Sequence, residues 1–375
     1  MKIRVLEVLA TLRRAGAERV AVSIACGLDR SRFETEVVSL KPAFAGGFEP
    51  VLAEHGVPVK HLGKWNGLDP RMWPRLAGAL EAFRPEIVHT HSYVMRYVLP
   101  AWAMARRGAL VHTVHNLAER EVEPLGRAVH RMAFRVGAVP VAISNEVARS
   151  FERMYGFAPP ATIPNGADTG GGFRPEARER WRRERGFAES DLLVASAARF
   201  EAQKNPLGLI EAFARAAEGN AAAHLVMAGE GSLLEASRRL AARLGMERRV
   251  HFTGLCLDVP ELLSACDLFV LASDWEGSSV AVMEAMAARL PVVATAVGGV
   301  PELVEDGVTG VLVPAGDSAA LVRALSDLAG NPARRRAFGE AAGRRARQFD
   351  ASAMVERYAE LFERVCAGGR KCRAS

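Results

Sequence analysis

The sequence predicts two doubly wound α/β domains in succession, each with a parallel sheet between helices. Its 375 residues suit two domains that each bury a sizeable core. Short β-branched runs alternate with longer amphipathic stretches, a spacing typical of parallel sheets with crossover helices. Each half of the chain contains its own series of alternating strands and helices. We therefore expect two similar α/β domains that face each other across a cleft.

The expected strands are short apolar runs, separated by helical patterns such as Glu18–Leu28 and Asn205–Ala217. Open α/β sheets bind ligands at the carboxyl ends of their strands, so residues with chemistry should follow strands directly. The first half contains the strand candidates Ile3–Leu9, Glu36–Leu40, Ile87–Thr90, Leu110–Val114 and Val139–Ser144. The second half contains Leu192–Ala197, His224–Ala228, Val250–Thr253, Leu268–Leu271, Pro291–Ala294 and Gly310–Val313.

The join between the domains is expected between Pro164 and Arg174. The stretch IPNGADTGGGFRP is rich in residues that interrupt regular structure, and the glycines 170–172 suit a hinge. We predict a first domain at residues 1–168 and a second at 169–350. Residues 351–375 are expected to form a helix and a basic tail, with the helix packing back on the first domain.

Composition and cysteine usage are those of a globular protein from a reducing compartment. Hydrophobic residues make up 49% and charged residues 25%, and no apolar run approaches the roughly 18 residues of a membrane span. The start, MKIRVLEVLA, alternates as a strand does, so we expect no signal peptide. The five cysteines form no C-x-x-C pair, which argues against disulfides and a zinc site. We expect a cytoplasmic location, with peripheral binding to the inner face of the membrane.

The net charge of +6 lies in residues 1–168, which hold 22 Lys and Arg against 16 Asp and Glu. This excess favours an anionic partner, either phospholipid headgroups or a phosphorylated acceptor; an arginine-rich surface that only reflects composition is the alternative. Nucleic acid is not expected, because no basic motif is interleaved with aromatic residues. Residues 124–137, PLGRAVHRMAFRVG, are expected to form a basic helical stripe that binds an anionic membrane, and a solvated helix face is the alternative. The stripe consists of Arg127, His130, Arg131 and Arg135.

The strongest chemical signal follows the predicted strand Leu268–Leu271. A short loop contains Glu276, and a helix begins near Ser278 or Ser279, both good N-caps. The free amides of a helix N-terminus favour a phosphate. Glu284 lies in the second turn of this otherwise apolar helix, where a carboxylate needs a partner. We expect that partner to be a ribose or sugar diol; a buried ion pair with an arginine is the alternative.

A second signal follows the predicted strand Leu192–Ala197. The loop contains Arg199 and Lys204. Arg offers a planar fork and Lys a compact charge, so the two can converge on a pyrophosphate. Alone this signal is weak, because loop cations are mostly solvated.

Together these motifs resemble family 4 of the glycosyltransferases. The second half has E-x7-E, R-F-x-x-x-K-N-P and T-A-V-G-G-V-P-E-L-V-E-D-G-V-T-G-V-L-V-P, and the first half has A-G-A-E-R-V, I-V-H-T-H-S, V-H-T-V-H-N and I-P-N-G-A-D. The resemblance covers most of the chain, with the motifs in the family's order. It implies the GT-B fold, with two Rossmann-like domains: the first binds the acceptor and the second binds a nucleotide-diphosphate sugar. It also implies retention of the anomeric configuration, and a saccharide or lipid-linked acceptor from cell-surface polysaccharide or glycolipid synthesis.

The resemblance also assigns roles to residues. Arg199 and Lys204 would hold the donor diphosphate, Glu284 the ribose hydroxyls and Glu276 the transferred sugar. His115 matches the family's active-site histidine and would act in catalysis with Glu276, Arg199 and Lys204. Further donor-side positions are Gly16, Gly229, Gly254, Leu255, Gly277, Ser278, Ser279, Gly298 and Gly299. The acceptor side would include His89, His91 and Asn165, although histidines at strand ends can also be satisfied polar core residues.

Two positions depart from the family pattern. Ala15 stands where a second glycine often precedes A-E-R, so the contact of Gly16 with the donor is less well supported. Arg289 stands where the family usually has glycine, at a helix end that favours a left-handed residue; a non-glycine residue there costs about 1 kcal/mol.

We expect no metal and no other cofactor besides the nucleotide sugar as co-substrate. The chain has no Asp-x-Asp pair, and Arg199, Lys204 and helix amides would take the place of a metal's charge.

Three rival functions are weighed. A nucleotide-sugar epimerase of the same fold would turn over donor without an acceptor. A catalytically inactive sugar-nucleotide-binding protein would need no catalytic residues. All four charged residues of the motifs are nevertheless present, namely Arg199, Lys204, Glu276 and Glu284. A dinucleotide-dependent oxidoreductase is disfavoured, since only Gly16 of a G-x-G-x-x-G fingerprint follows the first strand.

Overall fold

The structure is a computed structural model that describes the backbone of residues 2–373 and the side chains of residues 2–368. The predicted basic tail beyond residue 368, with Cys372, therefore lies outside the described side chains. The chain divides into two compact units. The N-terminal unit comprises Met1–Asn165 and Ala351–Ser375, and the C-terminal unit comprises Gly166–Asp350.

The N-terminal unit has a seven-stranded sheet in the order β3-β2-β1-β4-β5-β6-β7, with every neighbouring pair parallel. Its central strand, β4, is buried at every residue, as expected for a parallel sheet between helices. The strands are β1 (Ile3–Leu9), β2 (Phe33–Ser39), β3 (Val59–His61), β4 (Ile87–His91), β5 (Ala109–Val114), β6 (Val139–Ala142) and β7 (Ala161–Thr162).

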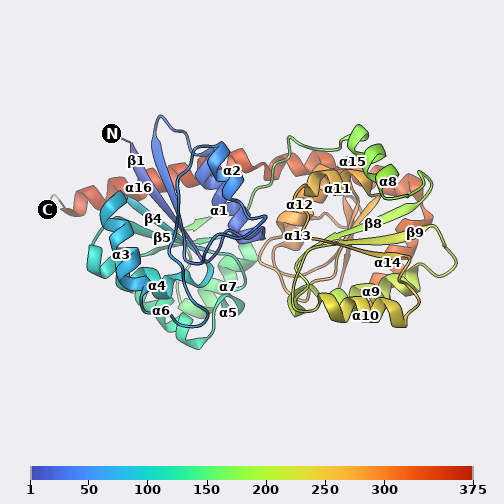
Figure 1. The fold of residues 1–375 in the computed structure, drawn as a ribbon, viewed down its shortest axis with the longest axis horizontal. Coiled ribbons are helices and arrows are strands. Elements are labelled where there is room, and N and C mark those ends of the chain that lie inside the picture. Colours follow the sequence, from blue (N-terminus) through green and yellow to red (C-terminus); the bar gives the residue numbers. More distant parts are fainter. Residues whose placement is uncertain (1, 374–375) are drawn as a thin grey trace. The chain divides into compact units, whose positions relative to one another are not determined.

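Helices cover both faces of this sheet (Figure 1). Buried hydrophobic side chains of α3, α4 and α6 pack on one face of the sheet, and those of α1 and α2 pack on the other face. The helices are α1 (Gly16–Gly27), α2 (Glu49–Glu54), α3 (Met72–Phe83), α4 (Met95–Ala105), α5 (Ala118–Glu121), α6 (Pro124–Arg135), α7 (Asn145–Tyr155) and α16 (Ala351–Arg373), with the short 3₁₀ helix η1 (Ser92–Val94).

The last helix, α16, packs on the same face as α1. The Tyr358 hydroxyl lies 2.8 Å from the Thr113 hydroxyl of β5, and Val355 fills the space beside Gly27 of α1. Arg32 forms ion pairs with Glu356 and Glu363 of the helix. The final helix of the chain thus completes the core of the first unit.

The C-terminal unit has a six-stranded parallel sheet in the order β10-β9-β8-β11-β12-β13. Helices α9, α10 and α14 cover one face of this sheet (Figure 1). The strands are β8 (Leu192–Ala197), β9 (Ala223–Ala228), β10 (Val250–Gly254), β11 (Leu268–Leu271), β12 (Val292–Thr295) and β13 (Gly310–Val313). The helices are α8 (Pro175–Glu184), α9 (Pro206–Ala216), α10 (Leu234–Arg243), α11 (Val259–Ala265), α12 (Val280–Ala287), α13 (Val300–Leu303), α14 (Ser318–Gly330) and α15 (Pro332–Ala346), with η2 (Ala202–Lys204) and η3 (Arg347–Phe349).

The two sheets confirm the doubly wound α/β prediction. Each predicted strand is present, and the additional strands β3 and β7 have three and two residues. Strands this short carry too little pattern to be recognised in a sequence.

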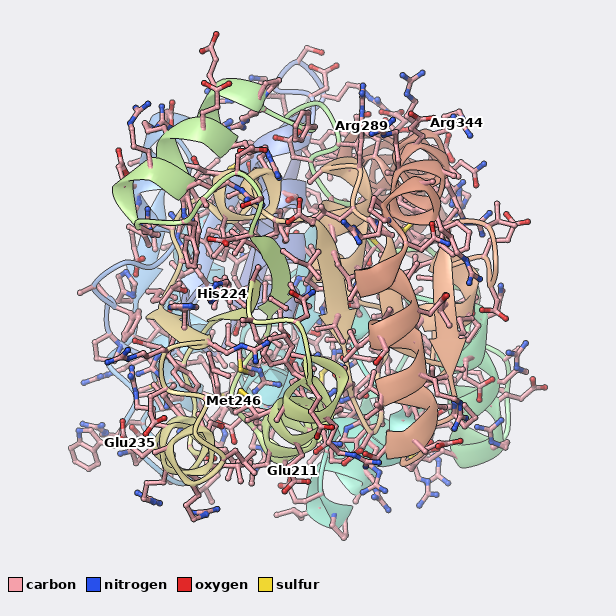
Figure 2. The ribbon with its side chains drawn as sticks, turned by 90° about the vertical axis from the view of Figure 1, so that its right-hand side faces the viewer. Glu211, His224, Glu235, Met246, Arg289 and Arg344 are labelled. Atoms are coloured by element: carbon pink, nitrogen blue, oxygen red, sulfur yellow. The ribbon has the colours of Figure 1, made fainter. Side chains whose placement is uncertain are left out.

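Arg289 follows α12 in the left-handed conformation, with φ +59°. It confirms the strained helix end expected where the family has glycine. Figure 2 shows Arg289 and Arg344 at one end of the C-terminal unit, where both line a hollow of about 640 Å³. The hollow lies at the C-terminal end of α12, whereas the predicted donor residues lie at its N-terminal end.

Candidate active site

In the C-terminal unit, the loop after β8 presents Arg199 and Lys204 at the carboxyl edge of the sheet. Arg199 is exposed, and its guanidinium donates to the Gln203 side chain at 3.3 Å, with the charge of Glu201 nearby. Lys204 ends the 3₁₀ helix η2 and forms an ion pair with Glu276. Asn205, at φ +47°, caps the following helix α9 by accepting from the Gly208 amide at 3.1 Å. The loop therefore has a fixed shape with one available guanidinium.

A second loop, after β11, lies against the first. The Asp274 amide donates to the Gln203 carbonyl at 2.9 Å, and the Gln203 side chain donates to the Trp275 carbonyl at 2.9 Å. Glu276 is 4% exposed and accepts from the Ser273 hydroxyl at 2.7 Å as well as from Lys204. The carboxylate predicted to meet the sugar is thus held by neighbours from both loops.

The helix after this loop begins as the sequence predicts. Ser279 is the N-cap of α12, and its hydroxyl accepts from the Val282 amide at 3.4 Å. Glu284 projects from the second turn and is 8% exposed. Gly277 and Ser278 precede the cap, so amides of the first turn and two carboxylates lie on one short segment.

Two glycines are required by close backbone approach. A Cβ on Gly298 would lie 1.7 Å from the Glu276 carbonyl oxygen, and φ is +53°. A Cβ on Gly229 would lie 2.1 Å from the Ala198 carbonyl oxygen, and φ is +139°. Gly298 therefore lets the loop after β12 touch the Glu276 loop, and Gly229 lets the loop after β9 touch the Arg199 loop. Gly299 is the N-cap of α13, and its amide donates to the Gly277 carbonyl at 2.9 Å.

The loop after β10 completes this edge. The Gly254 carbonyl accepts from the Gly229 amide at 2.8 Å, and Leu255 follows, half-buried. The predicted donor residues of the C-terminal unit are therefore gathered on neighbouring loops of one sheet edge.

In the N-terminal unit, a buried polar layer lies between the sheet and helices α1 and α16. Glu7 of β1 is fully buried, and it accepts from His89 at 2.9 Å and from His91 at 2.7 Å. Burial alone would raise the pKa of Glu7, but the charge and hydrogen bond of His89 and the hydrogen bond and charge of His91 lower that pKa to about 2. Burial and the neighbouring His89 lower the pKa of His91 to about 4.

His115 lies directly after β5 and is half-buried. Its Nε2 lies 2.8 Å from Nδ1 of His91, and the two rings stack with centroids 5.1 Å apart. Burial and the neighbouring histidines hold the pKa of His115 well below its usual range. Glu121 of α5 accepts from the His115 backbone amide at 3.3 Å, and burial raises the pKa of Glu121 to about 7.

His89 and His91 are 0% and 1% exposed, and hydrogen bonds within the unit occupy both ring nitrogens of each. A direct contact with the acceptor stays a prediction for both, and their burial does not favour it. Asn165 is buried at the end of the unit's first segment. Gly16 begins α1 with open space around it.

Glu7, His89 and His91 also offer ligand atoms within 4.8 Å of one another, as a metal site would. The carboxylate, however, contacts both imidazoles directly at hydrogen-bond distances of 2.9 and 2.7 Å. An ion bound between them would replace those contacts. The geometry fits a hydrogen-bonded network.

The predicted basic stripe is corrected at one position. His130 of α6 is 2% exposed and packs edge-on against His112 with ring centroids 4.6 Å apart. It therefore faces the core and does not belong to the stripe. On the outer side of this helix, Leu125 and Met132 are 66% and 60% exposed.

Sequence reasoning missed Glu7, Thr113, Tyr358 and Glu121. A usable signal existed for Glu7, because a carboxylate inside the buried strand Ile3–Leu9 needs a partner. No sequence signal places Tyr358, more than two hundred positions from Thr113, beside it.

Comparison with known proteins decides the family. The model of "Glycosyltransferase Family 4" matches residues 14–170, and the model of "Glycosyl transferases group 1" matches residues 177–345. A D-inositol 3-phosphate glycosyltransferase of Thermomonospora curvata is 30% identical over 362 residues, which cover 84% of this chain and 83% of that protein. The chain belongs to family 4 of the glycosyltransferases. It is a retaining glycosyltransferase that uses a nucleotide sugar.

Other relatives match this glycosyltransferase over different lengths. The putative glycosyltransferase EpsD of Bacillus subtilis is 36% identical over 193 residues, and the match spans 51% of each chain. Anabaena Alr3699/HepE in complex with UDP and glucose has a TM-score of 0.85 at 24% identity, covering 96% of this chain and 99% of that one. WaaG, a glycosyltransferase involved in lipopolysaccharide biosynthesis, has a TM-score of 0.77 at 18% identity, covering 96% and 99%. These structures show the GT-B fold.

Among the described helices, none is both long and apolar enough to cross a membrane.

Proposed function

We propose that this glycosyltransferase transfers a sugar from a UDP-sugar to a saccharide or lipid-linked acceptor in cell-surface polysaccharide or glycolipid synthesis, without a metal ion. UDP is proposed because a structure of HepE with UDP matches 97% of this chain at 25% identity, with a TM-score of 0.79. The acceptor class is proposed because WaaG is described as acting in lipopolysaccharide biosynthesis.

The observation that carries the proposal is the pair of joined loops after β8 and β11. They hold Arg199, Lys204 and Glu276 at one sheet edge, and Gln203 ties them together. A diphosphate beside Arg199 and Lys204 would have its charge neutralised as the bond to the sugar breaks, which stabilises the leaving group. Glu284, one turn into α12, is assigned to the ribose hydroxyls.

The Lys204–Glu276 ion pair has a consequence for the donor. Lys204 cannot act on a diphosphate as a free cation while Glu276 neutralises it, so Arg199 is the main available charge before the donor binds. Binding is proposed to redirect Lys204 toward the phosphate and to free Glu276 for the hydroxyls of the sugar. Both partners stay nearly buried, so each charge needs a partner at every stage.

The transfer itself is proposed to pass through an oxocarbenium-like transition state. The acceptor oxygen would attack the anomeric carbon from the face that the phosphate leaves, and the departing phosphate would accept the acceptor proton. This order of events retains the anomeric configuration. His115 of the N-terminal unit is assigned to the reacting sugar.

Metal independence is proposed because protein groups supply the positive charge. A guanidinium, an ammonium and the amides of the first turn of α12 would do what a divalent ion does in glycosyltransferases with Asp-x-Asp pairs.

Binding to an anionic membrane is proposed for α6. Leu125 and Met132 are exposed on this helix, and Arg131 and Arg135 lie beside them in sequence. Exposed apolar side chains next to arginines favour the interface of an anionic bilayer. Sedimentation with vesicles of phosphatidylglycerol at low salt tests this; a protein that stays in the supernatant contradicts it.

A thermal-shift screen against UDP, GDP, ADP and TDP in EDTA tests the donor assignment. The expected result is stabilisation by UDP that is lost in Arg199→Ala and in Glu284→Ala. Arg215→Ala, an exposed arginine of α9, is the matched control and should keep the shift. Stabilisation by a different nucleotide would overturn the choice of UDP, and a UDP shift that survives Arg199→Ala and Glu284→Ala would overturn the site.

A further inference from the structure

Three side chains from neighbouring strands of the N-terminal sheet are linked in a row by hydrogen bonds, called here the hydrogen-bonded chain. Glu7 lies on β1, His91 ends β4 and His115 follows β5, and these strands are adjacent in the sheet. The Glu7 Oε2 to His91 Nε2 distance is 2.7 Å, and the His91 Nδ1 to His115 Nε2 distance is 2.8 Å. The chain runs from the fully buried carboxylate to a half-buried imidazole at the sheet edge.

The positions of the protons follow from these contacts. A carboxylate only accepts, so Nε2 of His91 carries the proton that faces Glu7. Burial keeps the pKa of His91 near 4, so at neutral pH its ring has one proton and Nδ1 is an acceptor. Nε2 of His115 must therefore donate to it. Because His115 is also neutral, its Nδ1 carries a lone pair and no proton.

The other groups that face this chain do not compete for its two hydrogen bonds. His89 contacts the other carboxylate oxygen, Oε1, and its far nitrogen meets Thr113. Glu121 contacts the backbone amide of His115. The described contacts of His115 leave Nδ1 as the ring atom that has no hydrogen-bond partner within the unit.

We propose that Glu7 is a positioning residue that acts through His91 to hold His115 as a hydrogen-bond acceptor toward a hydroxyl of the reacting sugar. The proposal rests on the proposed function in so far as it places His115 at that sugar. A carboxylate that fixes the tautomer and direction of an imidazole is a common supporting arrangement in active sites. Here a second imidazole lies between the carboxylate and the acting ring.

A double-mutant cycle separates this role from a structural one. The rate to measure is UDP release from UDP-glucose, with water as acceptor, in the full-length protein. Glu7→Gln is expected to lower kcat by about tenfold, the scale of lost supporting contacts, with little change in KM. In a His115→Ala background the same substitution is expected to have no further effect, because Glu7 acts through His115. An equal loss in both backgrounds would overturn the proposal.

Thr90→Val is the matched control. Thr90 lies on β4 between His89 and His91, is fully buried and bonds His112 on the opposite face of the sheet. Replacing Thr90 with valine removes buried hydrogen bonds of the same strand and leaves the Glu7–His91–His115 hydrogen bonds in place. The rate is expected to stay within about twofold of wild type, since His91 of β4 keeps its hydrogen bonds to Glu7 and His115.

An NMR measurement decides the proposal independently of turnover. In protein with ¹⁵N-labelled histidine, Nδ1 of His115 should be unprotonated, with an ¹⁵N–¹⁵N coupling across the hydrogen bond to His91. Glu7→Gln should weaken that coupling, because an amide presents both a donor and an acceptor to His91. A proton on Nδ1 of His115, or a coupling unchanged by Glu7→Gln, would overturn the proposal. A wild type with this signature but no activity would instead count against the proposed function.

Discussion

The carboxyl edge of the N-terminal sheet holds the uncharged histidines His91 and His115 near the buried carboxylate of Glu7, whereas the same edge of the C-terminal sheet holds an arginine and a lysine–glutamate pair. His91 and His115 have lowered pKa values because they are buried among other imidazoles. Arg199 is exposed, and Lys204 forms an ion pair with Glu276. Under the proposed function, the same fold would provide a surface for hydroxyls in one unit and for phosphate in the other.

The two units share a fold but differ in the charge at the carboxyl edge of the sheet, which suits them to different parts of the proposed reaction. Parallel strands present their loops at one edge in both units, but burial decides the charge that those loops carry. A phosphate needs cations that remain charged, and an imidazole can accept a hydrogen bond from a hydroxyl only while its ring stays neutral.

Removing either cation of the C-terminal edge should cause the largest loss. Arg199→Ala and Lys204→Ala are each expected to lower kcat/KM for UDP-glucose by about 10²–10³-fold, because each supplies charge to the leaving diphosphate. The check is the initial rate of UDP release. Arg215→Ala serves as the control and should change the rate less than twofold. Near-normal rates in both cation variants would show that the C-terminal edge does not supply that charge.

Acid should destabilise the N-terminal unit first. The unfolded state protonates its histidines near pH 6.5, whereas His91 and His130 remain neutral until about pH 4 in the folded state. The unfolded state binds more protons between these values, so stability falls as pH drops from 6.5 to 4. His91 alone accounts for about 3 kcal/mol, at 1.36 kcal/mol per unit. His112 and His115 add to the loss.

Hydrogen exchange resolved by unit, corrected for intrinsic rates, measures this effect between pH 7 and 4.5. The C-terminal unit should lose less, because its histidines with lowered pKa, His224 and His251, are only half-buried. Equal loss of protection in the two units would contradict the contrast in buried histidines.

Glu121 should act in the opposite direction. Burial raises its pKa to about 7, so the folded state binds more protons than the unfolded state between pH 4.5 and 7. Its contribution to stability therefore falls as pH rises through that range, and it partly offsets the four histidines. Glu121→Gln should become more stabilising relative to wild type from pH 5 to pH 8. Urea unfolding at the two pH values measures this; a difference that does not change with pH would refute the assignment.

The smallest effect concerns left-handed arginines, which both units use at helix ends. Arg289 follows α12, and Arg84 caps α3 at φ +51°. Glycine relieves the strain at such positions, so Arg289→Gly and Arg84→Gly should each raise the free energy of unfolding by about 0.5–1 kcal/mol. Chemical denaturation of the two variants measures both. A loss in Arg289→Gly alone would mean that its side chain stabilises the unit through contacts in the adjacent hollow.

The sequence predicted the C-terminal edge better than the N-terminal edge. Arg199, Lys204 and Glu276 lie in short loops after strands of strong pattern, so strand order alone brings them to one edge. Which partner each charge takes did not follow: the ion pair of Lys204 with Glu276 depends on the contact between two loops.

In the N-terminal unit the sequence located the histidines but not their surroundings. His89 and His91 were placed on the acceptor side, and the structure buries them behind Glu7 and α16. Tyr358 reaches Thr113 only because the last helix returns to the first sheet, a contact that local pattern cannot indicate. His130 had helical spacing with the arginines, but the packing of α6 on His112 turns it inward.

Turnover without metal tests directly whether protein groups alone neutralise the leaving diphosphate. UDP release from UDP-glucose is measured with the purified full-length protein in EDTA, and again with added Mg²⁺ or Mn²⁺. We expect the same rate within about twofold in each condition, because Arg199, Lys204 and the amides of α12 would supply the charge that the leaving diphosphate needs. A rate that EDTA abolishes and a divalent ion restores would contradict it.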